Sequence, residues 1–404
     1  MILSDDRQCE KMRASALLTG NCGVENSSLQ TSAISKWHYH LLLIVLVWGC
    51  SQWANYMVLG IRLGGDSSSY MSGASSVIQS LPLEGRAVFS LPYVYVLAGF
   101  SQIGASLTHV VIFQCVVALL ISFLIYLSAK LCFSWKVGLI ASLLFLVNPD
   151  IQRWNFYILP ETIGTASLVL TTTLAIFYRK DARWVYLLLA SCFILGLIRP
   201  DTIYLLIPLA VYWTKKDRKL SYFLLFVLFA GILFYSANLP SRFNQIIIDT
   251  WSKGEIIWGY SGLSFPPEAN VDVKDFDSWW KLLAWYFLSD PLWFFKILFI
   301  RLTYFLGHHR PFYSLFHNLF AVVSSLVIYI LAIVGTVTNK GALRFNLTVW
   351  GIFLLQLAVC MGICVDWDGR FYLRVLPLLL IVVSAGVVVL WERISIRNLR
   401  NNTV

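Results

Sequence analysis

The sequence predicts an all-α integral membrane protein with about ten transmembrane helices, because long apolar runs alternate with short polar segments. Of its 404 residues, 58% are hydrophobic and only 13% are charged, and the mean hydropathy is +0.71. A soluble domain of this size carries about 25% charged residues. The apolar excess lies in runs close to the ~20 residues that an α-helix needs to cross a bilayer.

A polytopic domain is expected over residues 37–391, between two cytoplasmic tails. The first tail, residues 1–36, is polar and rich in serine and asparagine, which is typical of disorder. The second tail, residues 392–404, is basic. The candidate spans are residues 37–61, 108–129, 137–148, 162–178, 184–198, 203–213, 220–239, 315–337, 345–365 and 375–391.

Basic residues gather in the short loops on one side of this arrangement, and the positive-inside rule places that side in the cytoplasm. They are Lys130 and Lys136, then Arg179, Lys180 and Arg183, then Lys215, Lys216, Arg218 and Lys219, then Lys340 and Arg344, then Arg393, Arg397 and Arg400. Both termini are therefore expected in the cytoplasm, in a bacterial inner or plasma membrane. The largest exported loops are residues 62–107 and 240–314, and we expect the exported face to carry the working polar groups.

Three spans are short, which predicts a recessed cavity. The run from Val137 to Asn148 covers roughly 18 Å of a hydrocarbon core about 30 Å thick. Irregular backbone at membrane depth is tolerated where it lines a cavity or is buried in protein. We therefore expect a polar cavity open to the exported side, with Asn148, Asp150, Arg199 and Asp201 near its wall.

Two exported segments are predicted to be interfacial helices. Residues 67–81 place Tyr70 and Ala74 on an apolar face opposite serine and glycine. The pair Asp290-Pro291 is a helix start, and the helix that follows is mostly apolar. It is expected to lie in the interface with Lys296 and Arg301 snorkelling to lipid phosphates, or else to form a further span.

Charge and motifs exclude several classes of function. The net charge of +10 comes from loop clusters that set membrane topology, so no nucleic-acid partner is expected, and the membrane lipids are the partners that this composition requires. The sequence contains no Walker A, G-x-S-x-G, H-E-x-x-H or Rossmann motif. A nucleotide-driven pump and an ordinary membrane metalloprotease are therefore not expected.

Three acidic residues in exported segments are candidates for catalysis. Asp66 could be a general base, or it could be the N-cap of the helix that follows. Asp150 and Glu161 share one short loop, and Glu161 also stands in a first helical turn, where the helix dipole favours a negative charge. A carboxylate this close to the bilayer is costly without a partner.

The candidate anion ligands are cationic residues on the same side. Arg199 lies in the tight turn Arg199-Pro200-Asp201, as a phosphate clamp or as the local partner of Asp201. Arg370 begins the last span, and His309 in His308-His309-Arg310 is a weaker candidate. Asp366-x-Asp368 could hold a divalent metal, but two carboxylates alone are a weak metal signal, and no cofactor is certain.

These residues, in this order, resemble the GT-C superfamily of membrane glycosyltransferases, which includes protein O-mannosyltransferases and lipid A aminoarabinose transferases. The matching features are Gly65-Asp66 with Tyr70 and Ala74, Arg86 with Leu91-Pro92-Tyr93, Asp150 or Pro160-Glu161, Arg199-Pro200, and Gly369-Arg370-Phe371-Tyr372 with Pro377. The chain departs from the family where Tyr70 stands four residues after Asp66 rather than three, and it lacks the large soluble C-terminal domain of some members.

The resemblance implies an inverting transfer of a sugar from a polyprenyl-phosphate donor to a glycan, lipid or protein acceptor. The resemblance implies that Arg199 and Arg370 bind the phosphate of the donor. Arg86, His309 and Tyr70 are further candidates for donor binding. Asp66 deprotonates the acceptor hydroxyl as the general base. Glu161 and Asp150, either of which matches the family's acid after the third span, are the other catalytic candidates.

Two other functions remain open from sequence. A transporter or flippase for a lipid-linked glycan would also need an interior cavity with arginines, although it would more often contain two matching halves, which this sequence lacks. A glycan polymerase or ligase would use the same kind of donor.

The topology can be tested by thiol labelling in a cysteine-free background. Cysteines placed at Lys216 and Arg397 should resist an impermeant reagent added from outside, whereas one at Gly262 should react. Labelling of position 216 from outside would show that the predicted orientation is wrong.

Overall fold

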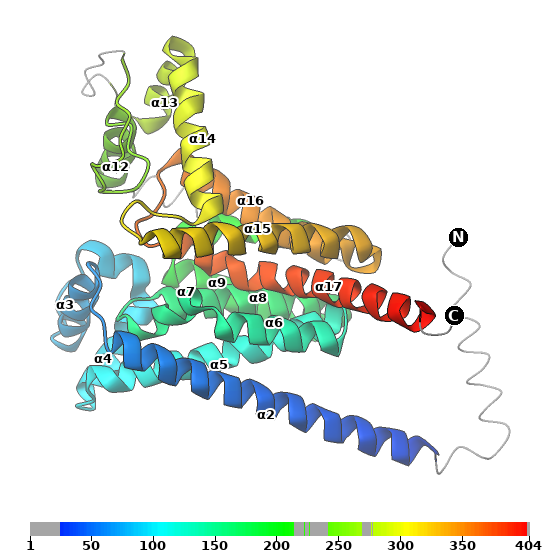
Figure 1. Ribbon diagram of the computed structural model, residues 1–404. Helices are drawn as coiled ribbons and strands as arrows, with labels where there is room; N and C mark the ends of the chain where they lie inside the picture. The colour runs from blue at the N-terminus through cyan, green and yellow to red at the C-terminus, as the bar shows by residue number, and fades with distance from the viewer. Residues whose placement is uncertain are drawn as a thin grey trace. The chain divides into compact units, whose positions relative to one another are not determined.

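The computed structural model describes residues 25–213, 222, 226, 241–268, 276 and 278–401. It is all-α (Figure 1), and backbone pairing outside the helices of the described residues is limited to isolated bridges. The chain divides into two units, residues 1–50 and residues 51–404. Helix α2 (Glu25–Leu59) begins inside the segment expected as a tail, and residues 1–24 lie outside the described part.

Five helices in the described part are long and apolar enough to cross a membrane, which indicates a multi-pass membrane protein. They are His38–Leu59 within α2, α5 (Leu107–Cys132), α15 (Leu315–Thr338), the combined η6 (Lys340–Ala342) and α16 (Leu343–Gly362), and Arg370–Ile396 within α17 (Arg370–Asn401). A sixth candidate is α13 (Trp279–Ser289) with α14 (Pro291–Gly307), which are bent by 116° at their junction.

The expected number of ten spans is not confirmed. Helix α8 (Glu161–Lys180) matches the span at 162–178 but is outside the set of membrane-capable helices. Three further expected spans form short apolar helices, namely α6 (Trp135–Val147), η3 (Ala182–Trp184) with α9 (Val185–Ile198), and η4 (Pro200–Leu205) with α10 (Leu206–Trp213). The span at 220–239 lies outside the described residues, apart from Tyr222 and Phe226.

Helix α17 forms the core of the second unit. It packs against α6, α8, α15 and α16, and in Figure 1 it runs, in red, alongside α15 and α6. Every residue from Tyr372 to Gly386 is buried. A helix that is apolar on all faces is stable only inside a protein or a membrane, so this sequence selects the central position.

Helix α8 is unusual because it buries hydroxyl side chains between α5 and α9. The hydroxyls of Thr171, Thr172 and Thr173 donate to the carbonyls four residues earlier, at 2.7 to 2.9 Å. Back-bonding of this kind satisfies the polar atoms within the helix. A threonine-rich helix can therefore occupy the interior and present Glu161 from its first turn.

The remaining elements lie in the segments between these helices: α3 (Ser67–Ile78), η1 (Gly85–Ser90), α4 (Leu91–Gln102), α7 (Pro149–Gln152), η2 (Arg153–Phe156) and α12 (Ser241–Ser252). Two bridges tie distant loops together. Arg62 pairs with Tyr157, and Ile257 pairs with Val365. The first bridge fixes the loop before α3 against the loop before α8, and the second fixes the loop before α17.

Helix α14 starts where the sequence predicted, with Asp290 accepting the Trp293 N–H at 3.1 Å. The prediction that Arg301 snorkels to lipid phosphate is wrong. Its side chain is fully buried and donates to the carbonyls of Glu255 and Met361. Glu255 lies in a loop and Met361 in the last turn of α16, so neither carbonyl has a partner within a helix, and a guanidinium supplies several donors at once.

Helices α15 and α17 approach each other closely at two glycines. A Cβ added to Gly335 would lie 2.1 Å from the carbonyl oxygen of Val382, and one added to Gly386 would lie 2.1 Å from that of Leu331. Small residues allow membrane helices to bring their backbones together, so these glycines set the separation of the two helices.

Gly335→Ala should therefore destabilise the protein, because the methyl group would push α15 away from α17. An overpacked site typically loses about 1–3 kcal/mol, which thermal unfolding in detergent can detect. Gly99→Ala is the matched control, since a Cβ there meets nothing within 4 Å. Equal melting temperatures for the Gly335 variant and the wild type would contradict close packing at this crossing.

Candidate active site

Five of the predicted site residues form one line of alternating charges, which we call the charge chain: Arg86, Asp66, Arg370, Glu161 and Arg199. Arg86 pairs with one oxygen of Asp66, and the other oxygen accepts a hydrogen bond from Arg370 Nη1 at 3.2 Å. The same Nη1 lies 3.3 Å from Glu161 Oε1. Glu161 Oε1 also accepts from Arg199 Nη2 at 2.8 Å. Side-chain exposure falls from 51% at Arg86 to 9% at Arg199, so the line leads from solvent to the interior.

The structure tests the capping interpretation of Asp66 and leaves its catalytic role a prediction. Asp66 occupies the N-cap position of α3, but its side chain makes no capping hydrogen bond. Its carboxylate is directed to the two guanidiniums instead. Burial acts to raise the pKa of Asp66, whereas Arg370 and Arg86 act to lower it. The two arginines together outweigh burial, so the pKa lies below its ordinary value. Asp66 is therefore ionised and has two cationic partners.

The position of Asp66 is fixed by the loop before it. The Arg62 N–H donates to the Phe156 carbonyl at 2.8 Å, and the Ile158 N–H donates to the Arg62 carbonyl at 3.1 Å. Ser67 Oγ donates to the Ile158 carbonyl at 3.0 Å. These bonds hold the start of α3 beside the segment that leads into α8.

Glu161 and Arg199 come from two different helix ends. Glu161 begins α8, while Arg199 follows α9 in the turn that the sequence predicted. The observed partner of Arg199 is Glu161, and the side chain of Asp201 is not among the described ones. Gly164 makes room for the arginine, because a Cβ there would lie 3.3 Å from Arg199 Cγ.

A buried amide network supports the segment between α6 and α8. Gln52 donates to Gln152 at 2.8 Å, and Asn155 donates to both of these side chains. Thr162 donates to Asn155 at 2.9 Å, and Gln114 donates to the Asn155 carbonyl at 2.8 Å. Satisfied buried networks rigidify their surroundings, so Glu161 is presented from an ordered support.

A small cavity lies beside the charge chain. It offers about 20 Å³ to the centres of water molecules, which is room for about one water. Glu161, Arg370 and Arg374 supply its charges, and apolar side chains such as Phe145 and Leu373 form much of the rest. Asn148, Asp150 and Arg199, expected near the wall of a cavity, are not part of this lining.

Tyr70 lies next to the charge chain without joining it. Its ring is 3% exposed and meets Tyr93 edge-on, with centroids 5.6 Å apart. Burial raises the pKa of Tyr70, so the phenol is neutral and can act as a hydrogen-bond donor.

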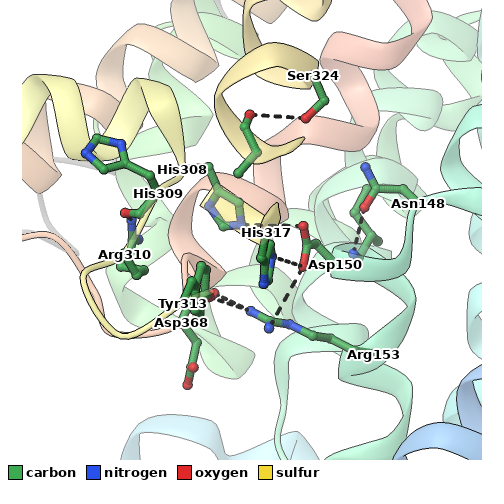
Figure 2. A network of polar contacts seen from close by, with 12 residues as sticks. Asn148, Asp150, Arg153, His308, His309, Arg310, Tyr313, His317, Ser324 and Asp368 are labelled. Atoms are coloured by element: carbon green, nitrogen blue, oxygen red, sulfur yellow. Dashed lines mark hydrogen bonds and ion pairs between the residues drawn. The ribbon is translucent and has the colours of Figure 1, made fainter. Parts of the chain in front are cut away.

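Asp150 belongs to a different group, which we call the Asp150 cluster: Asp150, Arg153, His308, Tyr313 and His317 (Figure 2). The Asp150 carboxylate lies 3.6 Å from His317 Nε2, and 3.9 Å from both His308 Nε2 and Arg153 Nη1. Arg153 Nη2 also lies 3.4 Å from the Tyr313 hydroxyl. The two acids of one short loop therefore serve two different sites.

His309, which was predicted to bind the sugar donor, lies outside both the charge chain and the Asp150 cluster. Its ring stacks on Tyr304 with centroids 4.2 Å apart, and Figure 2 shows it on the far side of His308 from Asp150. His308 has a left-handed backbone, with φ of 51°. This conformation ends α14 and turns the ring of His308, rather than that of His309, toward Asp150.

Sequence reasoning assigned no role to four members of the Asp150 cluster. Arg153 carried a usable signal, because it follows Asp150 by three residues and such pairs share a helical face. His308 was named only as part of the basic triplet, and the loop that contains Tyr313 has no periodicity that predicts side-chain direction. His317 lies in the first turn of α15, but nothing in the sequence indicates that this turn packs against Asp150.

No metal centre is formed by the part of the chain that the structure describes: it contains no group of three or more His, Cys, Asp or Glu placed to hold an ion. At the weak candidate Asp366-x-Asp368, one side chain and one backbone carbonyl make contacts within the protein. The Asp366 carboxylate accepts the Arg370 backbone N–H, and the Asp368 carbonyl accepts from Arg153 Nη2 at 2.6 Å.

The charge chain carries an excess of positive charge. It contains three guanidiniums and two carboxylates. Asp366 and Asp368 add two carboxylates near Arg370, and Arg374 and Arg310 add two guanidiniums to the same surroundings, which leaves this excess unchanged. A partly buried site with one uncompensated cation attracts an anion, and guanidiniums match the geometry of phosphate.

The comparisons with known proteins agree with this chemistry. Residues 90–239 match the family described as dolichyl-phosphate-mannose-protein mannosyltransferase. The matched segment contains Glu161 and Arg199, and the resemblance to the GT-C glycosyltransferases is thereby confirmed. A comparison with the curated proteins found no match.

The pair of Arg199 and Glu161 can be tested by substitution. Arg199→Ala should lower the free energy of unfolding by about 3–5 kcal/mol, because it removes one partner of a buried ion pair. Arg199→Lys should retain more stability but lose activity, since an ammonium cannot reproduce the planar fork. Thermal unfolding and a turnover assay separate the two effects.

Arg183→Lys is the matched control, because Arg183 pairs with Asp181 at the surface and is 90% exposed. Its melting temperature and turnover should equal those of the wild type. If Arg199→Lys and Arg370→Ala also turn over like the wild type, both arginines are structural.

Proposed function

We propose that the chain, which resembles the membrane glycosyltransferases of the GT-C type, transfers a sugar from a polyprenyl-phosphate donor to an acceptor hydroxyl on the exported side of the membrane. The reaction is an inverting displacement. The family match supports a lipid-linked donor, and the acceptor and the side of the membrane are our proposal.

The observation that carries the proposal is the excess guanidinium in the charge chain. A lipid phosphate is a good leaving group that needs cations more than it needs an acid. Arg370 and Arg199 lie toward the buried end of the charge chain, where electrostatic interactions are strongest. Arg86, at the exposed end, is placed to assist the departing or entering phosphate.

In the proposed step, the acceptor oxygen attacks the anomeric carbon from the face opposite the phosphate. The new carbon–oxygen bond forms as the bond to the phosphate oxygen breaks, and the lipid phosphate leaves with the electron pair. The proton of the acceptor hydroxyl passes to Asp66. No second carboxylic acid is needed for the leaving group, in contrast to a glycosidase.

The ion pairs of Asp66 explain how a carboxylate with a lowered pKa can act as a base. Arg370 Nη1 is shared between Asp66 and Glu161. When a phosphate takes hydrogen bonds from Arg370, Asp66 loses part of its cationic surroundings and its affinity for a proton rises. Donor binding thereby prepares the base, and Glu161 keeps Arg370 in place.

Asp66→Asn tests the role of the base. Asparagine occupies an N-cap position as well as aspartate does, so α3 should fold normally. The amide cannot accept a proton at neutral pH, and a general base contributes about 10²–10⁴-fold. Sugar transfer from a polyprenyl-phosphate donor should fall by that order while donor binding is retained.

Matched expression and melting temperature of the two proteins are the control for folding. An Asn variant that is as active as the wild type would assign Asp66 a structural role. The search for a base would then move to Glu161 and Asp150.

A further inference from the structure

The Asp150 cluster contains polar atoms whose hydrogen-bonding capacity is not used within the protein. His308 is 3% exposed, and neither ring nitrogen has a hydrogen-bond partner. The Nε atom of Arg153 is likewise buried without one. Leaving buried polar groups unpaired is energetically costly, so their convergence on one carboxylate calls for a functional explanation.

The groups of the cluster stand close to Asp150 without a direct hydrogen bond to it. His317, His308 and Arg153 approach the Asp150 carboxylate to 3.6–3.9 Å. These separations are too short for an oxygen to lie between the two atoms, but a hydroxyl at the flank of such a pair can donate to the carboxylate and accept from a nitrogen. Figure 2 shows the side chains converging on Asp150 from α7 and η2, from the α14–α15 loop and from α15.

The charge of the cluster favours a neutral ligand. Arg153 and Asp150 have opposite charges. Burial, Arg310 and Arg153 hold the pKa of His308 well below its usual range, so this ring is neutral. The guanidinium of Arg310 donates to four backbone carbonyls, those of Tyr304, His309, Asp366 and Trp367. The hydrogen bonds of Arg310 therefore go to the backbone rather than to a ligand.

Aromatic rings adjoin the cluster and form what we call the aromatic platform: Tyr260, Phe312 and Trp367. Phe312 and Trp367 stack at 4.3 Å with planes 13° apart, and Tyr260 meets both edge-on. Phe312 and Trp367 remain 36% and 38% exposed. The next residue, Tyr313, stacks on His317 at 4.1 Å, which joins the platform to the cluster.

A binding site for a small polar ring typically combines partly exposed aromatic faces with a few converging polar groups. A sugar ring has apolar C–H faces, which complement the aromatic platform. It also has hydroxyl groups, which complement the polar atoms of the Asp150 cluster. Scattered interfacial aromatics would face lipid from separate helices, whereas these three rings come from loops and pack on one another.

The cluster is also joined to the charge chain. Arg153 donates to the carbonyl of Asp368, two residues before Arg370. Burial raises the pKa of the Asp368 carboxyl while Arg153 and Arg370 both act to lower it, which places both cations near this group. A ligand on the cluster would therefore lie next to the phosphate-binding residues.

We propose that the Asp150 cluster and the aromatic platform form the acceptor subsite and hold a neutral sugar ring, so that the acceptor is a carbohydrate. This inference rests on the proposed function, because it gives the transferred sugar its destination.

Binding can be measured directly by saturation-transfer NMR on the full chain in nanodiscs. The probes are methyl glycosides of mannose, glucose, galactose and N-acetylglucosamine. At least one should bind the wild type, and His317→Gln and Trp367→Ala should each weaken its affinity by about tenfold, the equivalent of about one hydrogen bond. Trp367→Phe keeps a ring and should retain most of the affinity.

Trp280→Ala is the matched control, because Trp280 is 56% exposed on α13, outside the platform. Its glycoside affinity should equal that of the wild type. Melting temperatures of all variants establish that they fold. Absence of binding by every glycoside, or equal affinity in wild type, His317→Gln and Trp367→Ala, would overturn the subsite.

Turnover distinguishes this inference from the proposed function. With a bound glycoside as acceptor, His317→Gln should raise the KM for the glycoside about tenfold and leave the KM for the polyprenyl-phosphate donor unchanged. Transfer to a serine- or threonine-containing peptide but to no glycoside would overturn the carbohydrate acceptor and leave the proposed function standing. Glycoside binding without transfer from any lipid-phosphate donor would overturn the proposed function and, with it, the acceptor role.

Discussion

The bridge that Arg370 makes between Asp66 and Glu161 is the interaction on which the site depends. It joins the start of α3, the start of α8 and the start of α17, three segments that are far apart in the chain. Each carboxylate would be costly at the edge of a bilayer without a cation. Arg370 serves both, and Arg86 and Arg199 complete the neutralisation at the two ends. One arginine thus orders the loops and leaves one positive charge in excess.

The rest of the second unit holds this bridge at a defined geometry. Helix α17 is buried on all sides from Tyr372 to Gly386, and the close approach at Gly335 fixes it against α15. The amide network around Asn155 and the bridge between Arg62 and Tyr157 order the two loops that carry the acids. Rigid support matters because phosphate recognition by arginine is directional. In the Asp150 cluster, beside the charge chain, this scaffold leaves buried nitrogens of His308 and Arg153 without hydrogen-bond partners.

Two neighbouring histidines illustrate how the backbone selects a functional residue. The sequence presented His308 and His309 side by side in one basic triplet, and we predicted His309 as the ligand. The left-handed conformation of His308 reverses the chain after α14, so His308 faces Asp150 and the ring of His309 contacts that of Tyr304. Arg301 illustrates the same limit, since its helical position was predicted but the carbonyls that bind it come from residues far along the chain.

The sequence by itself determined the class of structure and the types of residue at the site. Apolar runs predict membrane helices from composition alone, and acids or arginines placed where those runs end are costly enough to indicate a role, as Asp66, Glu161, Arg199 and Arg370 illustrate. Only the tertiary structure decided which charges pair, that Asp66 is bound to arginines rather than capping α3, and that Asp150 belongs to a separate cluster. The physical reason is that periodicity along one helix specifies a face, whereas pairing depends on how helices distant in the chain pack and on how the loops between them turn.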